Sequence, residues 1–245
     1  MAAEAPLDRP AFYALRPGRA RELITLLHPP YTLWHLSYVA LGAAVAPVIH
    51  VDRLLAAVAA FFLAVGISAH ALDELQGRPL RTGLSRRTLL ALAGAGLVGA
   101  CAIGVVGAVT IDASLFAFVA VGAFLVLAYN LELFGGRFHT DLWFAVAWGA
   151  FPALTGYWAN ALTVEPGGVL VAGACLALSL AQRRLSTPVR ELRRRTVAVQ
   201  GRQLLSDGSS VELSAARLAA PLDGALAALS LALPLVAGAV LAVRL

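Results

Sequence analysis

Ionisable side chains gather beside an apolar run in the first third of the chain. His70 lies one helical turn from Asp73 and Glu74, so the three side chains share one face of a helix. Arg78 and Arg81 follow directly. Carboxylates are oxygen ligands that suit Mg²⁺, and guanidinium groups bind phosphate oxygens in pairs. The pattern predicts a site for a metal ion and a phosphate, and the alternative is a helix end that is charged because it meets water.

A second charged group occupies positions 187–201, where one acidic residue, Glu191, stands among arginines. The basic members are Arg190, Arg193, Arg194 and Arg195. Such a segment fits a basic lid over a diphosphate. It equally fits a loop that is attracted to the anionic heads of membrane lipids. Composition alone leaves both interpretations open.

A third group comprises Tyr129, Asn130 and Glu132, near the end of another apolar run. Polar side chains at the end of a membrane helix are candidates for a cavity wall, because their solvation by lipid is costly. Tyr129 and Asn130 are therefore candidate substrate-binding residues. An ordinary helix terminus would carry the same residue types.

The composition excludes several classes of protein. The chain has 245 residues, of which 60% are hydrophobic and 13% charged, and its mean hydropathy is +0.79. A soluble domain usually has about 45–50% apolar and about 25% charged residues, so a water-soluble enzyme and a disordered chain are excluded. There is no lysine, which excludes Schiff-base chemistry. Cys101 and Cys175 lie inside apolar runs and form no metal-ligand pair by spacing.

Apolar segments of membrane-spanning length recur along the chain. A transmembrane helix needs about 20 mostly apolar residues, and these segments lack the alternation that a β-barrel requires. They lie at 31–50, 54–72, 88–110, 113–133, 142–163, 167–182 and 221–243. The sequence therefore predicts an all-α polytopic membrane protein, one domain over residues 1–245, built as a bundle of about seven transmembrane helices.

The arginines indicate how the chain is oriented. Most of them fall in the N-terminal segment and in alternate connections, and since basic loops stay in the cytoplasm, residues 1–30 and the long loop 183–220 are predicted to be cytoplasmic. We expect an interfacial helix near 19–27 and a possible hairpin at Asp207 and Gly208. The net charge of +5 then reflects topology, with membrane lipid as a partner and no nucleic acid. The lysine-free composition favours a bacterial cytoplasmic membrane.

Four stretches, in one order, resemble motifs of a known membrane family. They comprise the opening of the first apolar run, the tail of the first charged group, an aromatic stretch beyond Tyr129, and the second charged group. Their residues are His28-Pro29-Pro30-Tyr31-Thr32-Leu33, Asp73 with Arg78-Pro79-Leu80-Arg81-Thr82-Gly83-Leu84-Ser85, Trp148-Gly149-Ala150-Phe151-Pro152 with Thr155-Gly156-Tyr157-Trp158, and Arg190-Glu191-Leu192 with Arg194-Arg195-Thr196-Val197-Ala198-Val199. The chain thereby resembles the UbiA-type intramembrane prenyltransferases, most of all their 1,4-dihydroxy-2-naphthoate branch.

The resemblance implies an enzyme that transfers a prenyl group from a polyprenyl diphosphate to an aromatic or other lipid-soluble acceptor, as in quinone biosynthesis. Asp73, Glu74 and Glu191 would be catalytic and would hold Mg²⁺. The substrate-binding residues would be His70, Arg78, Arg81, Tyr129, Asn130, Arg190, Arg194 and Arg195. Both charged groups would lie on the cytoplasmic side.

Both charged motifs depart from the family's pattern. The first has Ala69 in place of asparagine and lacks its second aspartate, and the second begins with Glu191 and lacks its last aspartate. Because bound metal is the usual means of stabilising a diphosphate leaving group, an alternative stays open. In it, the chain is catalytically inactive and binds isoprenoids or lipids, or is the partner subunit of an active enzyme.

Overall fold

The computed structural model describes residues 9–15 and 18–245, so positions 1–8 and 16–17 of the predicted N-terminal cytoplasmic segment lie outside the described residues. The elements follow one another as α1 (Arg19–Leu26), α2 (Pro29–Ala44), α3 (Val51–Phe61), η1 (Phe62–Ala69), α4 (His70–Leu75), α5 (Arg86–Thr110), α6 (Leu115–Asn130), α7 (Leu133–Gly136), α8 (Asp141–Ala145), η2 (Val146–Ala150), α9 (Phe151–Ala161), α10 (Pro166–Arg194), β1 (Arg202–Leu204), β2 (Ser210–Glu212) and α11 (Ala215–Arg244). The two η segments are π-helical, a rare form that is frequently found at functional sites.

Each predicted apolar segment contains a helix, although segment 31–50 is helical only through Ala44. α3, η1 and α4 continue one another over Val51–Leu75, and α8, η2 and α9 do the same over 141–161. Within the described residues, four helices are long and apolar enough to cross a membrane: Val51–Leu75, α5, α10 and α11. α6 is a shorter apolar helix. The helical class is confirmed, whereas seven membrane crossings stay a prediction.

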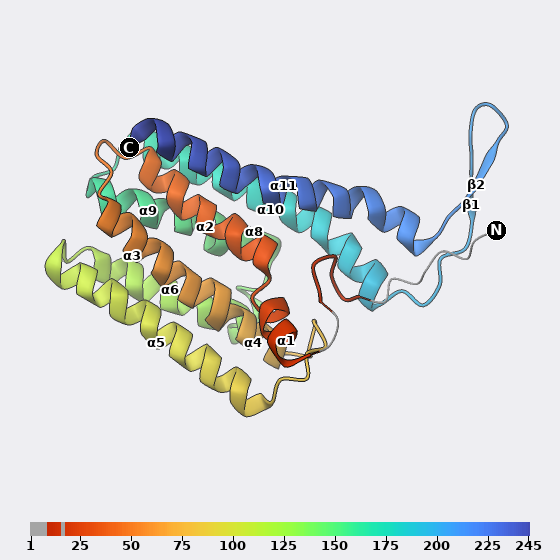
Figure 1. Cartoon of the computed structure of the whole chain (residues 1–245), viewed down its shortest axis with the longest axis horizontal. Coiled ribbons are helices and arrows are strands. Elements are labelled where there is room, and N and C mark those ends of the chain that lie inside the picture. Colours follow the sequence, from red (N-terminus) through yellow and green to blue (C-terminus); the bar gives the residue numbers. More distant parts are fainter. Residues whose placement is uncertain (1–8, 16–17) are drawn as a thin grey trace.

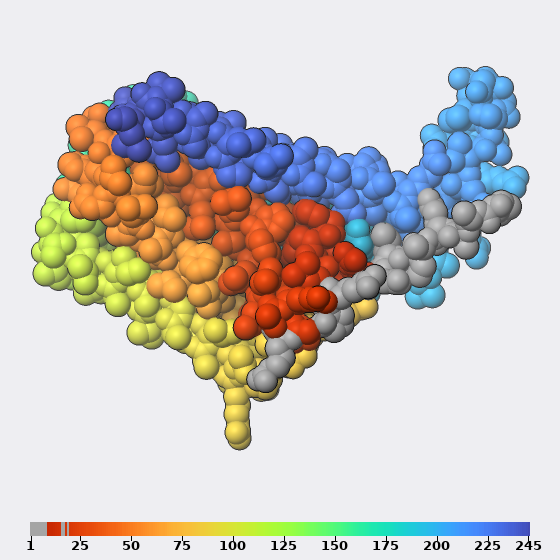
Figure 2. Space-filling view, in the orientation of Figure 1, coloured from red at the N-terminus to blue at the C-terminus, as the bar shows by residue number. Residues whose placement is uncertain are grey.

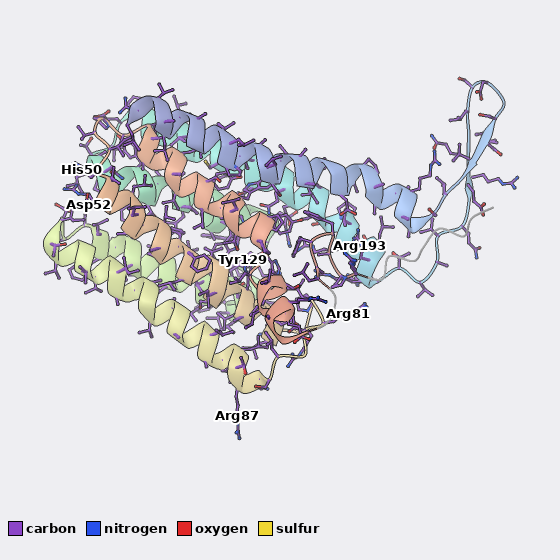
Figure 3. All side chains as sticks on the ribbon, in the orientation of Figure 1. His50, Asp52, Arg81, Arg87, Tyr129 and Arg193 are labelled. Carbon is purple, nitrogen blue, oxygen red and sulfur yellow. The ribbon has the colours of Figure 1, made fainter. Side chains whose placement is uncertain are left out.

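The helices form one elongated bundle (Figure 1). α10 and α11 lie side by side along one edge, α2 packs against α11 and α9, and α5 packs against η1 and α6 at the opposite edge. His50 and Asp52 lie at one end, whereas Arg81 and Arg193 lie toward the other (Figure 3). Arginines of the first and second charged groups therefore lie toward the same end of the bundle.

The backbones of α2 and α9 approach each other more closely than side chains would permit. A Cβ atom on Gly42 would lie 2.0 Å from the Ala153 carbonyl oxygen, and one on Gly156 would lie 2.1 Å from that of Val39. No larger residue fits at either position without moving a helix. Such close approach between small residues drives helix association in lipid, where hydrophobic burial between helices contributes little.

The predicted cytoplasmic loop 183–220 begins later than expected. α10 continues through Arg194, so the second charged group starts on a helix and not on a loop. Pro188 lies inside this helix without ending it. Proline removes one backbone hydrogen bond, and the packing of α10 against α8, η2 and α11 outweighs that loss.

The structure contains both the short helix predicted near 19–27 and the hairpin predicted at Asp207 and Gly208. α1 forms where the short N-terminal helix was expected, and β1 pairs antiparallel with β2. In the turn between them, Gly208 has a φ of 82°, and the Asp207 carboxylate accepts hydrogen bonds from the backbone N–H and hydroxyl of Ser209. Figure 2 shows this hairpin standing clear of the helical body.

Candidate functional site

A polar cavity of about 480 Å³ lies at the end of the bundle that carries the arginines. Its walls come from α2, η1, α4, α6, α8, η2, α10, α11, the N-terminal segment 9–15 and the adjoining loops. The predicted site residues that line it are His70, Asp73, Tyr129, Asn130, Arg190, Glu191, Arg194 and Arg195. The three charged or polar groups of the sequence, distant from one another along the chain, thus meet around one space.

Three predicted site residues do not line this cavity: Glu74, Arg78 and Arg81. Glu74 is fully buried, and its carboxylate accepts hydrogen bonds from the backbone N–H of Leu80 and from both the N–H and the hydroxyl of Thr82, at 2.8–2.9 Å. These bonds hold the 76–85 loop against α4. Glu74 is thus a structural anchor of that loop and lies outside the lining of the cavity.

Arg78 has the same local role. Its guanidinium donates to the carbonyl oxygens of Thr82 and Leu84 at 2.9 and 2.7 Å. Arg78 and Arg81 both have a φ of 56°, a left-handed conformation that is uncommon for residues with a Cβ. Arg81 is exposed. The loop is therefore a tightly bonded turn, and its arginines do not point into the cavity that the other predicted residues share.

The described residues contain no group of three or more His, Cys, Asp or Glu side chains placed to hold a metal ion. With Glu74 bound to the loop, Asp73 and Glu191 are the two predicted metal ligands that line the cavity. Mg²⁺ commonly binds through one or two carboxylates together with substrate phosphates. Asp73 and Glu191 fit that manner of binding, in which the substrate supplies the remaining oxygens.

α10 places three arginines on the cavity wall at helical spacing: Arg183, Arg190 and Arg194. Arg183 forms an ion pair with Asp141 at 2.7 Å and lies over the Phe144 ring, 5.4 Å from its centroid. Arg190 donates to the Thr187 hydroxyl and, among the described residues, forms no ion pair. Arg190 therefore keeps most of its donor capacity for an anion, as does Arg195, another cavity arginine without an ion pair among the described residues.

The N-terminal segment 9–15 covers part of the cavity. Arg193 donates to the Arg9 carbonyl oxygen and Arg194 to that of Pro10, at 3.1 and 3.4 Å. The backbone N–H of Leu15 donates to the Thr25 hydroxyl. Arg193 also pairs with Asp223 of α11, so the second charged group ties three parts of the chain together.

Sequence reasoning missed three histidines of the cavity, His28, His35 and His139, which come from different elements. The Nδ1 atoms of His35 and His139 contact the carbonyl oxygens of Trp148 and Tyr129 at 2.7 and 3.0 Å. Because a carbonyl only accepts, each Nδ1 carries the proton, and in a neutral ring Nε2 keeps a lone pair. Both rings are thus oriented as bases.

The remaining missed residue, His28, stacks on His70 with ring centroids 4.0 Å apart and shares a hydrogen bond with the Tyr13 hydroxyl. Burial, together with the proximity of His70 and of the Arg194 guanidinium, lowers the pKa of His28 well below its usual value. His28 is therefore neutral at pH 7. In the sequence, the one feature that could have marked His28 as a site residue was its place in the motif that opens the first apolar run.

A second space, almost wholly apolar, runs between α3, α5, α6 and α9. Val65 and Trp148 line both this groove and the polar cavity. Val65 lies in η1 and Trp148 in η2, so each of the two π-helical segments supplies one residue to the boundary. The same segments supply the carbonyl oxygens of Gly66 and Trp148 that contact His70 and His35.

Comparison of the chain with models of known families, with characterised proteins and with solved structures gave no match.

Proposed function

We propose that the chain is a membrane prenyltransferase, which binds a prenyl diphosphate with its head in the polar cavity and its tail in the apolar groove. The observation that carries this proposal is the shared boundary of the two spaces at Val65 and Trp148. A polar chamber that carries arginines, next to an apolar one, is complementary to an amphiphile with an anionic head. The site's arginines favour a diphosphate as that head, because guanidinium groups bind its oxygens in pairs.

In the proposed reaction, the bond between the allylic carbon and the diphosphate oxygen breaks, and its electron pair leaves with the diphosphate. Arg190 and Arg194 stabilise the charge that develops on the leaving group. The Tyr129 and Trp148 rings flank the allylic cation, which is attracted to aromatic faces.

The allylic carbon then bonds to a carbon of the aromatic acceptor, and that carbon loses its proton to a base. Nε2 of His35 or His139 is suited to take it, because the backbone contact at Nδ1 leaves a lone pair there. Asp73 and Glu191 would hold Mg²⁺ with the diphosphate. When bound, Mg²⁺ supplies positive charge for the leaving group.

The proposal includes seven membrane crossings with the polar cavity at the cytoplasmic face, in a bacterial cytoplasmic membrane. The distribution of arginines supports this orientation, because both charged groups and the N-terminal segment lie toward one end. A diphosphate made in the cytoplasm would then reach its arginines without crossing the bilayer.

The test is a prenyl-transfer assay with the protein in lipid nanodiscs, with farnesyl diphosphate and a dihydroxynaphthoate or hydroxybenzoate acceptor. We expect product in the presence of Mg²⁺, less product with a chelator, and less with Asp73→Asn. Glu132→Gln, which changes another cavity carboxylate outside the predicted ligand set, is the matched control. If the chelator and Asp73→Asn both leave turnover unchanged, the metal assignment is wrong.

A second candidate function is binding without transfer, as an isoprenoid carrier or partner subunit. The specific observation in its favour is the loss of Glu74 from the cavity, which leaves two carboxylates where the resemblance implies more. Saturable binding of farnesyl diphosphate with no product across several acceptors would favour it. Measured turnover would eliminate it.

A further inference from the structure

The apolar groove is bounded at both ends by specific residues. Val65 and Trp148 stand at the end next to the polar cavity. At the far end, the Arg53 guanidinium donates to the Ala159 carbonyl oxygen at 3.2 Å, and both residues line the groove. This contact joins α3 to α9 and puts a polar group across the path of a hydrocarbon chain. The groove therefore has a finite length.

That length follows from the helices that form the walls. From Val65 to Arg53 the chain advances 12 positions, or about 18 Å at the usual rise per residue. From Trp148 to Ala159 it advances 11 positions, or about 16 Å. An extended chain gains about 1.2 Å per bond, so about 14 bonds fit in line. An isoprene unit adds about four such bonds, so between three and four units lie along this distance, with part of the tail on the open side of a groove whose enclosed volume is about 130 Å³.

We infer that the prenyl donor is short, farnesyl or geranylgeranyl diphosphate, and not the long polyprenyl diphosphate that the family resemblance implies. This inference rests on the proposed function. A longer tail would meet Arg53 and would have to fold back or leave the groove between helices. A geranyl tail would leave the far part of the groove unfilled.

Small side chains keep the groove open along α3, and one of them offers a graded test. Ala57 lines the groove 8 positions from Val65, at about 12 Å. Leucine at this position would fill the far third of the groove while leaving room for a geranyl tail. Ala102 of α5 is exposed and does not line the groove, so Ala102→Leu adds the same side chain without blocking the tail.

The experiment measures binding to the full chain in nanodiscs. The ligands are inorganic diphosphate and the geranyl, farnesyl, geranylgeranyl and solanesyl diphosphates, each competing with labelled farnesyl diphosphate. In the unsubstituted protein we expect the tightest binding for farnesyl or geranylgeranyl diphosphate. Ala57→Leu should weaken geranylgeranyl diphosphate about tenfold relative to geranyl diphosphate, because overfilling an apolar site is costly. Ala102→Leu should leave the order unchanged.

The outcomes separate this inference from the proposal on which it rests. Solanesyl diphosphate binding as tightly as geranylgeranyl diphosphate, or an unchanged order in a folded Ala57→Leu variant, overturns the length assignment alone. No prenyl diphosphate binding better than inorganic diphosphate overturns the proposed function as well. The series of ligands on the unsubstituted protein decides the matter even if Ala57→Leu does not fold.

Discussion

Two segments rich in arginine and acidic residues lie near the polar cavity, and they use those residues differently. In the first, from Glu74 through the 76–85 loop, the carboxylate of Glu74 and the guanidinium of Arg78 bond to the loop itself. In the second, on α10, Arg190 has a hydroxyl partner only and lines the cavity. Similar composition therefore stabilises a turn in one place and presents charge to a ligand in the other.

The difference shows what decides whether a charged group is available for chemistry. Glu74 is one residue from Asp73, yet it is fully buried against backbone donors while Asp73 lines the cavity. A group whose hydrogen-bonding capacity is used by its own loop contributes to folding. A group left with spare capacity at a cavity wall can bind a substrate. The predictions below test this division.

The largest expected effect is on stability, from Glu74→Ala. The substitution leaves the N–H groups of Leu80 and Thr82 without an acceptor in a buried place, and we expect a loss of at least about 3 kcal/mol. Thermal unfolding in detergent measures it. Glu191→Ala, at an exposed position, is the control and should change stability little. Equal losses of stability in the two variants would contradict the distinction between charged groups that stabilise their own loop and charged groups that face the cavity.

The next effect concerns binding. Arg190→Gln should weaken farnesyl diphosphate about tenfold to a hundredfold, because a charge-assisted contact is worth about 1.5–3 kcal/mol. Its melting temperature should stay close to that of the unsubstituted protein. Competition binding and thermal unfolding of one preparation give both numbers. Normal affinity in Arg190→Gln would remove this residue from the proposed diphosphate site.

Arg78→Gln should show the opposite combination. It loses two hydrogen bonds within the 76–85 loop, for which we expect a cost of about 1.5 kcal/mol in stability. Diphosphate affinity, measured below the unfolding temperature, should change less than in Arg190→Gln. A larger loss of affinity than of stability would place Arg78 with the ligand-binding group.

The smallest effect depends on pH and tests how the N-terminal segment 9–15 docks. While segment 9–15 is docked, His28 is buried beside Tyr13 and its pKa is lowered. When the segment is undocked, His28 is exposed and its pKa returns to about 6.5. Below pH 6.5 the undocked state therefore takes up a proton that the docked state does not. The free energy that favours docking of segment 9–15 is therefore fully present above pH 6.5, and it is smaller by up to about 1.4 kcal/mol at pH 5.5. Faster hydrogen exchange of 9–15 at the lower pH measures it, and His28→Asn should abolish the difference.

The helical class could be predicted from the sequence, because long apolar segments without alternation favour helices. The hairpin followed from Asp207 and Gly208, whose turn chemistry is local. The roles of Asp73 and Glu74 could not be separated in this way. Spacing places both on the same end of one helix, and only tertiary contacts with Leu80 and Thr82 decide which one is buried.

The cavity was predictable only in part. Its arginines and Asp73 belong to charge-rich segments that stand out in an apolar chain. His35 and His139 are single residues on separate elements, and no local pattern links them. The π-helical placement of Val65 and Trp148 has no compositional signature either, so the boundary between the two spaces emerges from the structure alone.

The contact between the α2 and α9 backbones at Gly42 and Gly156 has a consequence for how substrates reach the interior. Because the backbones of α2 and α9 are in direct contact, a change of side-chain rotamer cannot separate them. The two helices therefore move together as one rigid unit. Movement that admits a ligand must then occur where elements meet through side chains. The N-terminal segment 9–15, which covers part of the cavity and is held to α10 by two hydrogen bonds, is one such place.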